Sequence, residues 1–228
     1  MRVVVTGANR GIGLELARQL SQRGDQIEAG VRDPQSAGEL AALPNVRVHP
    51  LDVGDAKSVR AFAAAVNTAP IDMVLNVAGV LPRSSGLGQL AEDLSLDDAA
   101  NTFDINALGP LRVVIALLPA VRKGTGKKLV HLTSGMGSIG DNKSGGAYAY
   151  RMSKAALNMM SRSLAVDLRN EGIISVVINP GWVKTDMGGA SAPTPVEESV
   201  AGILREVDKA TLADSGEFLN WKGNRYPW

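Results

Sequence analysis

The chain has 228 residues, 45% of them hydrophobic and 21% charged, which is enough apolar sequence for one substantial globular core. Its formal net charge of +1 gives no electrostatic reason to expect nucleic acid or an anionic membrane as a partner, and no apolar run approaches the roughly 18 residues typical of a membrane span. The absence of cysteine excludes disulfides, thiol catalysis and thiolate metal sites, and with an N-terminus that shows no leader pattern it fits a cytoplasmic protein.

Short apolar runs alternate with longer helical stretches from the N-terminus onward. The apolar runs predict strands at 2–7, 26–32, 46–53, 71–79, 127–134 and 174–181, with a further short strand at 216–221. Helices are predicted at 12–24, 33–43, 55–68, 97–122 and 148–171, and loops at 80–96 and 135–146. Asp33 and Asp55 are the expected N-caps, and Pro110 and Pro119 predict either a kink or an early end in the long helix.

Strands that alternate with helices are typical of βαβ units in a parallel sheet. We therefore predict a Rossmann-type doubly wound α/β sandwich, with a central parallel sheet of about seven strands and helices on both faces. No linker, repeat or change in composition divides the sequence, so we expect a single domain spanning residues 1–228.

A glycine-rich motif, TGANRGIG at residues 6–13, lies where the first strand meets the first helix. Its spacing, G-x-x-x-G-x-G, differs from the common G-x-G-x-x-G fingerprint but allows the same tight turn and close approach of the backbone to a pyrophosphate. The motif alone also fits a structural turn, and its position at the start of a helix favours nucleotide binding. The predicted binding residues are Gly7, Asn9, Arg10, Gly11, Ile12 and Gly13.

The end of the second predicted strand bears on the choice between NAD and NADP. An acidic residue there would bind the ribose 2′-OH of NAD, whereas an arginine would meet the 2′-phosphate of NADP. Asp33 is expected to cap a helix, which leaves Arg32 to contact the 2′ position, with Arg10 as a second positive charge. NADP(H) is therefore favoured over NAD(H). At the end of the third strand, beside Val53, Asp52 either accepts a hydrogen bond from the adenine amino group or is a simple turn residue.

The stretch YAYRMSK, residues 148–154, holds two of the chain's three tyrosines and a lysine. Residues four apart share one face of a helix, so Lys154 faces Tyr150, and Tyr148 is left for packing or a pocket wall. A chance amphipathic contact would explain the pair equally well by itself. A nearby ammonium lowers the pKa of a phenol, and general acid–base catalysis works best with a pKa close to the working pH. The pair is thus predicted to be a tuned proton donor beside a nicotinamide.

A carbonyl that is being reduced develops negative charge on oxygen, so a second hydrogen-bond donor is expected nearby. Ser134 ends the fifth strand at the carboxyl edge of the sheet, where open α/β sheets bind ligands, and Thr133 and Ser138 are rivals for this role. The two histidines, His49 and His131, lie far apart in strand-like runs and are expected to be ordinary sheet residues, so no metal site is predicted.

Together these motifs resemble the short-chain dehydrogenase/reductase family. The shared elements occur in the family's order between residues 6 and 185: TGANRGIG, LDV, NVAG, Asn106, Ser134, Tyr150-x-x-x-Lys154 and NPGWVKT. The stretch GSIGDNKSGGAYAYRMSKAALN and the ending NRYPW are most similar to the subgroup of C-factor-like and sniffer-type carbonyl reductases.

The resemblance implies a role for each matching position. Tyr150 would be the catalytic acid/base, Lys154 would lower its pKa and bind the nicotinamide ribose, Ser134 would orient the substrate carbonyl, and Asn106 would hold a water in a proton relay. The implied cofactor contacts beyond the glycine turn are Asn76, Ala78 and Gly79 at the adenosine ribose, and Pro180, Gly181, Val183 and Thr185 at the nicotinamide and its phosphate side. Family members are often homodimers or homotetramers joined through the helices at 97–122 and 148–171, whereas carbonyl reductases of this subgroup can be monomers, so the oligomeric state stays open.

The sequence departs from the family pattern at three places. Val77 replaces the second asparagine of the usual NNAG, the separation between Ser134 and Tyr150 is longer than the commonest pattern, and the region after Thr185 is short, which predicts a small substrate lid. The expected pocket walls are mostly apolar and suit an apolar or aromatic carbonyl: Leu81, Met136, Tyr148, Trp182 and Met187.

The predicted function is an NADP(H)-dependent oxidoreductase that reduces an apolar or aromatic aldehyde, ketone or quinone. The alternative is a nucleotide-sensing or C-factor-like signalling protein that binds NAD(P) with little turnover. A sensor would have no need for the complete set of asparagine, serine, tyrosine and lysine, so the enzyme is favoured.

Overall fold

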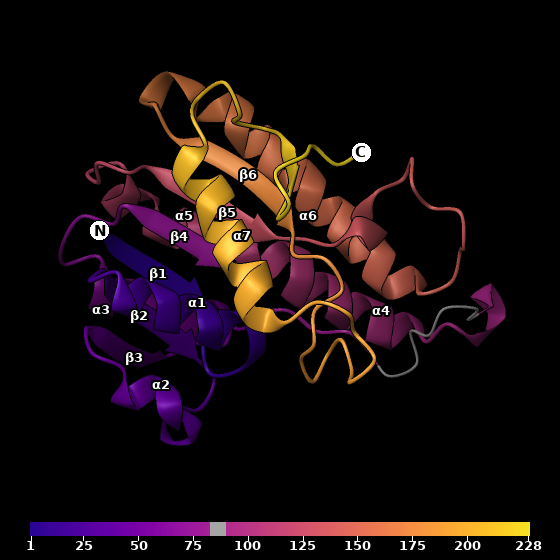
Figure 1. The fold of residues 1–228 in the computed structure, drawn as a ribbon, viewed down its shortest axis with the longest axis horizontal. Helices are drawn as coiled ribbons and strands as arrows, with labels where there is room; N and C mark the ends of the chain where they lie inside the picture. The colour runs from indigo at the N-terminus through magenta and orange to yellow at the C-terminus, as the bar shows by residue number, and fades with distance from the viewer. Residues whose placement is uncertain (83–89) are drawn as a thin grey trace.

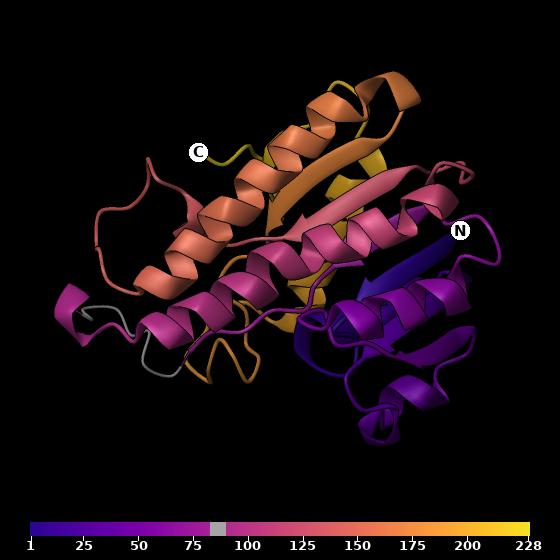
Figure 2. The same ribbon diagram turned by 180° about the vertical axis from the view of Figure 1, so that it is seen from behind.

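A parallel seven-stranded sheet lies at the centre of the structure, a computed structural model that describes residues 1–82 and 90–228 (Figures 1 and 2). Across the sheet the strands are β3 (Val46–Pro50), β2 (Gln26–Val31), β1 (Arg2–Thr6), β4 (Met73–Asn76), β5 (Lys128–Leu132), β6 (Ile174–Asn179) and β7 (Phe218–Asn220). All neighbouring pairs are parallel. The predicted doubly wound α/β fold is confirmed, although each strand ends earlier than the apolar run suggested.

Helices cover both faces of the sheet because the strands are apolar on both sides. Val3, Val4 and Val5 in β1 are fully buried, which is typical of a central parallel strand. Figure 1 shows α1 (Gly11–Gln22), α2 (Glu39–Ala42) and α7 (Val196–Lys209) on one face, and Figure 2 shows α3 (Ala56–Val66), α5 (Gly109–Val121) and α6 (Tyr148–Asp167) on the other. Each face has its own apolar core.

The strand order reverses between β1 and β4. The chain winds from β1 through β2 to β3 in one direction, then returns to place β4 on the other side of β1. The connections therefore diverge at the carboxyl ends of β1 and β4, and such a switch point is where open α/β sheets bind ligands. The fold thus fixes the place of the functional site before any side chain is considered.

The long helix predicted at 97–122 is continuous from Leu96 to Val121, so neither Pro110 nor Pro119 ends it early. It consists of α4 (Leu96–Phe103), a π-helical segment (Asp104–Leu108) and α5. The amide of Gly109 donates to the carbonyl of Asp104, five residues earlier. The next residue, Pro110, has no backbone N–H to donate. By length and apolar composition alone this helix could cross a membrane, so the prediction that no apolar run approaches such a length is wrong. Half of its most apolar 18-residue stretch is buried inside the protein, as in a core helix.

Two further helical regions differ from the sequence prediction. Asp33 does act as a cap, because its Oδ1 accepts from the amide of Gln35 at 3.0 Å, but the residues that follow form a 3₁₀ turn (Pro34–Ser36) before the short α2. No helix was predicted for α7, which has acidic residues in its first turn and buries Val200, Ile203 and Val207 against the sheet.

Candidate active site

The glycine turn between β1 and α1 has no room for a side chain at Gly7 or Gly13. Gly7 has a φ of 67°, and a Cβ on it would lie 2.8 Å from the Cα of Ala78. A Cβ on Gly13 would lie 2.2 Å from the carbonyl oxygen of Gly7. Arg10 at the N-cap makes no capping hydrogen bond, so its side chain does not occupy the start of α1. The turn therefore leaves the positive end of a helix open to an anion.

The loop after β4 is fastened to the end of β1 by Thr6. Its Oγ1 accepts from the amides of Val77 at 3.0 Å and Ala78 at 3.1 Å. These contacts hold residues 77–79 opposite the glycine turn and use backbone donors, so they do not require the asparagine that Val77 replaces. Thr6 was not among the predicted site residues, although a buried threonine that ends a strand immediately before a glycine turn is a usable signal.

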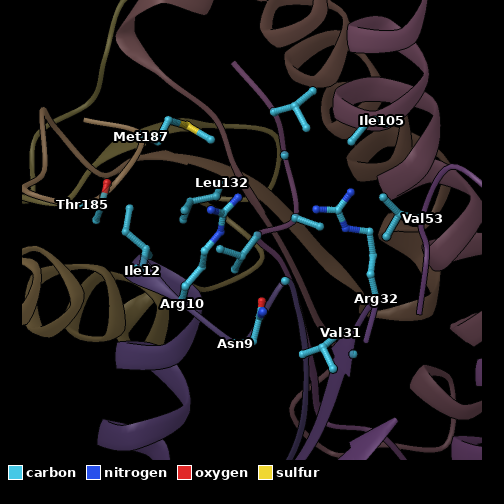
Figure 3. Close-up of a pocket in the computed structure, with 18 of the residues that line it drawn as sticks. Asn9, Arg10, Ile12, Val31, Arg32, Val53, Ile105, Leu132, Thr185 and Met187 are labelled. Atoms are coloured by element: carbon cyan, nitrogen blue, oxygen red, sulfur yellow. The ribbon is translucent and has the colours of Figure 1, made fainter. Parts of the chain in front are cut away.

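A cavity of about 490 Å³ lies over the carboxyl ends of the strands (Figure 3). The predicted residues that line it are Gly7, Asn9, Arg10, Gly11, Ile12, Gly13, Arg32, Asp52, Val53, Ala78, Gly79, Tyr150, Lys154, Pro180, Thr185 and Met187. Thr133, the rival candidate for the role of Ser134, lines it as well. The lining residues that sequence reasoning missed are Gly30, Val31, Leu51, Val77, Val80, Asn101, Ile105, Leu132 and Asp186. Most of the missed residues are apolar, and without the fold nothing separates them from core residues.

Other predicted site residues lie outside the wall of this cavity. They are Asn76, Asn106, Ser134, Gly181 and Val183, and the proposed pocket residues Leu81, Met136, Tyr148 and Trp182. The Trp182 indole donates to the carbonyl of Gly188 at 2.7 Å and is 57% exposed, so it braces the loop that follows β6. Of the five predicted pocket walls, Met187 alone lines the cavity.

Two arginines enter the cavity from opposite sides (Figure 3). Arg10 comes from the glycine turn and is 3.6 Å from Asp186, with both side chains largely exposed. Arg32 follows β2, and within residues 1–82 and 90–228 it forms no ion pair. The neighbouring Asp33 is engaged in its capping bond, so the positive charge of Arg32 stands uncompensated at the cavity wall.

Asp52 is a turn residue at the end of β3, and its contact with an adenine stays a prediction. It lines the cavity, and its Oδ1 accepts from the amide of Gly54 at 2.9 Å in a turn. Its own amide is held by the hydroxyl of Ser58 at 2.8 Å. The carboxylate is thus fixed in position at the strand end.

Helix α6 brings Tyr150 and Lys154 to the wall of the cavity. Tyr150 is 8% exposed and Lys154 is 5% exposed, and the Lys154 Nζ lies 5.7 Å from the centre of the Tyr150 ring. Ser134 follows β5 and lies close enough to the Tyr150 phenol to act on its pKa. Tyr148 begins the same helix with 36% of its surface exposed. The expectation that Lys154 shares a face with Tyr150 rather than Tyr148 is confirmed.

Burial dominates the electrostatics of this pair. It lowers the pKa of Lys154 to about 8 and raises the pKa of Tyr150 to about 12, while the nearby Ser134 hydroxyl acts in the lowering direction on the pKa of the phenol. The prediction that the lysine brings the Tyr150 pKa below its ordinary value is wrong. The Lys154 Nζ donates its hydrogen bond to the carbonyl of Leu132 at 2.8 Å. Desolvation of the buried phenol is the largest cause of the raised Tyr150 pKa.

Asn106 in the π-helical segment is fully buried and uses its side chain within the protein. Its Nδ2 donates to the carbonyl of Val80 at 2.9 Å and to the hydroxyl of Ser153 at 3.0 Å, and its Oδ1 accepts from the amide of Val80 at 2.8 Å. It therefore ties the loop after β4 to α6. A Cβ on Gly79 would lie 3.1 Å from the Asn106 Oδ1 and 3.7 Å from the Lys154 Nζ, so the glycine keeps this region open.

The buried His131 supports the site from beneath. Its Nδ1 is 3.1 Å from the Nδ2 of Asn76, and burial, with a smaller effect from Lys154, lowers its pKa to about 3, so it is neutral. His49 contacts Glu28 in the sheet at 2.6 Å. Both histidines are thus sheet residues, as expected. Over residues 1–82 and 90–228 there is no group of three or more His, Cys, Asp or Glu side chains placed to hold a metal ion.

Comparison with known proteins gives a consistent result. The family model for short chain dehydrogenases matches residues 1–195. The chain is 51% identical over 170 residues to C-signal of Myxococcus xanthus, covering 75% of this chain and 100% of that protein. It is 37% identical over 234 residues to 1-hydroxy-2-glutathionyl-2-methyl-3-butene dehydrogenase of a Rhodococcus species, covering 99% of each.

Solved structures of carbonyl reductases cover the whole chain. The carbonyl reductase Sniffer of D. melanogaster superposes with a TM-score of 0.94 at 30% identity and 99% coverage of that chain. The NADPH-bound carbonyl reductase from chicken fatty liver superposes with a TM-score of 0.92 at 36% identity and 98% coverage. These similarities confirm the predicted subgroup, and the chain belongs to the short-chain dehydrogenase/reductase family of oxidoreductases.

Proposed function

We propose that the protein is an NADPH-dependent reductase of apolar or aromatic aldehydes, ketones or quinones, with Tyr150 as the proton donor. One observation carries the proposal: a buried phenol, near Ser134 and beside Lys154, borders a cavity that Arg10 and Arg32 also line. This arrangement pairs a proton source with a binding site for a large anion. Both are needed for hydride transfer to a carbonyl.

The residues present fit a bound dinucleotide. The glycine turn and the start of α1 would hold its pyrophosphate. A side chain at Gly7 or Gly13 would collide with nearby backbone atoms, so glycine at these positions allows the tight turn. Arg10 and Arg32 supply the positive charge that a 2′-phosphate requires. The 36% identical carbonyl reductase from chicken fatty liver binds NADPH, and a 32% identical protein from Burkholderia multivorans binds NADP, which supports the same choice here.

The chain's own residues account for the rest of the reaction. When bound, NADPH would supply the hydride for the carbonyl carbon. The hydroxyls of Ser134 and Tyr150 bind the carbonyl oxygen, where negative charge develops, and the Tyr150 Oη gives that oxygen its proton. The ammonium of Lys154 stabilises the phenolate that remains. With its pKa raised to about 12, Tyr150 is protonated at neutral pH and therefore ready to act as an acid, which favours reduction as the working direction.

A substrate panel tests this proposal. Purified protein is mixed with NADPH and apolar or aromatic aldehydes, ketones and quinones, and the loss of NADPH is followed optically. We expect turnover with at least one of these classes and little with sugars or organic acids, because Leu132 and Met187 present apolar surface to the cavity. Failure of every carbonyl in the panel, with NADPH tightly bound, would remove the assignment.

A second candidate is a nucleotide-sensing or signalling protein with little turnover. The 51% identity to C-signal of Myxococcus xanthus favours it. The two candidates differ in one measurable property, since both bind NADPH but only the reductase oxidises it when a carbonyl is added. The panel therefore separates them, and the complete catalytic set at α6 and β5 supports the enzyme.

Substitution of Arg32 by alanine tests the cofactor preference. We expect NADPH to bind more weakly by about 1.5–3 kcal/mol, or roughly 10- to 150-fold, because a charged hydrogen bond to the 2′-phosphate is lost. NADH has no such phosphate, so its affinity should change little. Fluorescence titration with both nucleotides measures this, and Arg60→Ala, an exposed arginine on α3, is the control. An equal loss for both nucleotides would show that Arg32 does not contact the 2′ position.

The cytoplasmic location and a homodimer or homotetramer through α4, α5 and α6 stay predictions. So does the small lid after Thr185.

A further inference from the structure

The segment Tyr226–Trp228 lies against the loop that leads from β5 to α6. The Tyr226 hydroxyl donates to the Asp141 Oδ2 at 2.7 Å. The amide of Gly140 donates to the carbonyl of Trp228 at 2.7 Å, and the Ser138 hydroxyl donates to the same oxygen at 3.2 Å. Three hydrogen bonds thus join residues about eighty to ninety positions apart in the sequence, near the loop seen beside the C label in Figure 1.

This segment is itself anchored in the core. The rings of Tyr226 and Trp228 lie 5.0 Å and 5.5 Å from the ring of Phe218 in β7, and Phe218 is fully buried. The amide of Tyr226 also donates to the carbonyl of Phe218 at 2.7 Å. The loop is therefore fastened to a fixed support rather than to a second loop.

Tyr226 reaches the turn that carries Ser134. A Cβ added to Gly135 would lie 2.6 Å from the Tyr226 hydroxyl, so that hydroxyl is packed against the residue next to Ser134. On the other side of the same turn, a Cβ added to Gly137 would lie 2.9 Å from the Cβ of Lys154. The 3₁₀ turn Gly135–Gly137 is thus held between Tyr226 and the catalytic face of α6.

We propose that Tyr226 is a positioning residue for the reaction: through its bond to Asp141 and its contact with Gly135, it keeps the Ser134 hydroxyl facing Tyr150. The inference rests on the proposed reductase function. Ser134 also caps the 3₁₀ turn, because its Oγ accepts a hydrogen bond from the amide of Met136 at 3.1 Å. A shift of this turn would therefore change the direction of the Ser134 hydroxyl. Displacement of a catalytic group by about 1 Å costs up to about 10²-fold in rate.

Point substitutions test the contact. Tyr226→Phe keeps the ring on Phe218 and removes only the hydroxyl, and we expect kcat to fall about 10-fold with the affinity for NADPH unchanged. Asp141→Ala should have the same effect, whereas Asp141→Asn retains an acceptor oxygen and should restore most of the rate. Arg225→Gln is the matched control, because this neighbour pairs with Asp214 and Glu217 instead of the loop.

A double-mutant cycle with Ser134 separates positioning from general weakening of the fold. If Tyr226 acts through Ser134, then Ser134→Ala and the double variant Ser134→Ala with Tyr226→Phe should have the same kcat. Losses that multiply in the double variant would overturn the proposal. So would a wild-type kcat for both Tyr226→Phe and Asp141→Ala.

Hydrogen exchange supplies a readout that needs no turnover. The Gly140 amide is held by the Trp228 carbonyl, so we expect it and its neighbours in the loop to exchange faster in Tyr226→Phe and Asp141→Ala than in the wild type or Arg225→Gln. If wild-type protein reduces no carbonyl, the proposed function fails while the exchange data still test the contact. Unchanged exchange in both variants would show that Tyr226 does not hold the loop.

Discussion

Replacement of Tyr150 by phenylalanine is expected to lower kcat for carbonyl reduction by about 10²- to 10⁴-fold, the usual contribution of a general acid. The substitution keeps the ring that packs in α6 and removes only the hydroxyl that donates the proton. The remaining donor, Ser134, can still polarise the carbonyl, but an aliphatic hydroxyl is a far weaker acid than a phenol and does not replace it as the proton donor. The measurement is steady-state NADPH oxidation with the best substrate of the panel.

Two comparisons make the Tyr150 result specific. The affinity for NADPH, measured by fluorescence titration, should be nearly unchanged, because loss of the cofactor would mimic loss of the acid. Tyr148→Phe should cost far less than Tyr150→Phe, since Tyr148 is 36% exposed and does not line the cavity. Equal rates for the wild type and Tyr150→Phe would show that another group supplies the proton.

Patterns confined to neighbouring residues were sufficient for the fold and for much of the site. The apolar runs identified all seven strands. The central strands are continuously apolar because they are buried on both faces, whereas the edge strands β3 and β7 are only partly buried. The spacing of four residues between Tyr150 and Lys154 was sufficient to place them on one helix face. Asp33 could be identified as a cap because Pro34 follows it.

Features that depend on distant residues could not be predicted in this way. The bond between Tyr226 and Asp141 requires the sheet order, and the support of residues 77–79 by Thr6 requires the approach of β4 to β1. The direction of the Tyr150 pKa shift also depends on burial, which a sequence window does not contain. Helix α7 is a different case, because its apolar spacing and acidic first turn are visible in the sequence and were overlooked.

Substitution of Lys154 by methionine is expected to change stability and activity in opposite directions. Lys154 is 5% exposed, and burial lowers its pKa from 10.5 to about 8. At pH 7 the lysine is charged in both states, but the folded protein binds this proton less tightly than the unfolded chain does. That difference destabilises the fold by about 2–4 kcal/mol. Methionine has a similar length and no charge, but it leaves the Leu132 carbonyl without its donor, at a cost of about 1–3 kcal/mol. We expect a net gain of about 1 kcal/mol in the free energy of unfolding, with kcat lower by about 10²-fold or more because the phenolate loses its ammonium.

The pH dependence identifies burial of the charge as the cause of this gain. Below about pH 8 the lysine is charged in both the folded and unfolded states, so the destabilisation is fully present. As the pH rises from about 8 toward 10.5, the folded protein gives up the proton first, and the stability advantage of Lys154→Met should shrink and then reverse because of the lost hydrogen bond. Denaturant unfolding at several pH values measures this, with Lys123→Met, at an exposed position, as the control for loss of a lysine. A stability difference between the variant and the wild type that does not change with pH would show that the buried ammonium does not destabilise the fold. A variant less stable than the wild type at pH 7 would show the same.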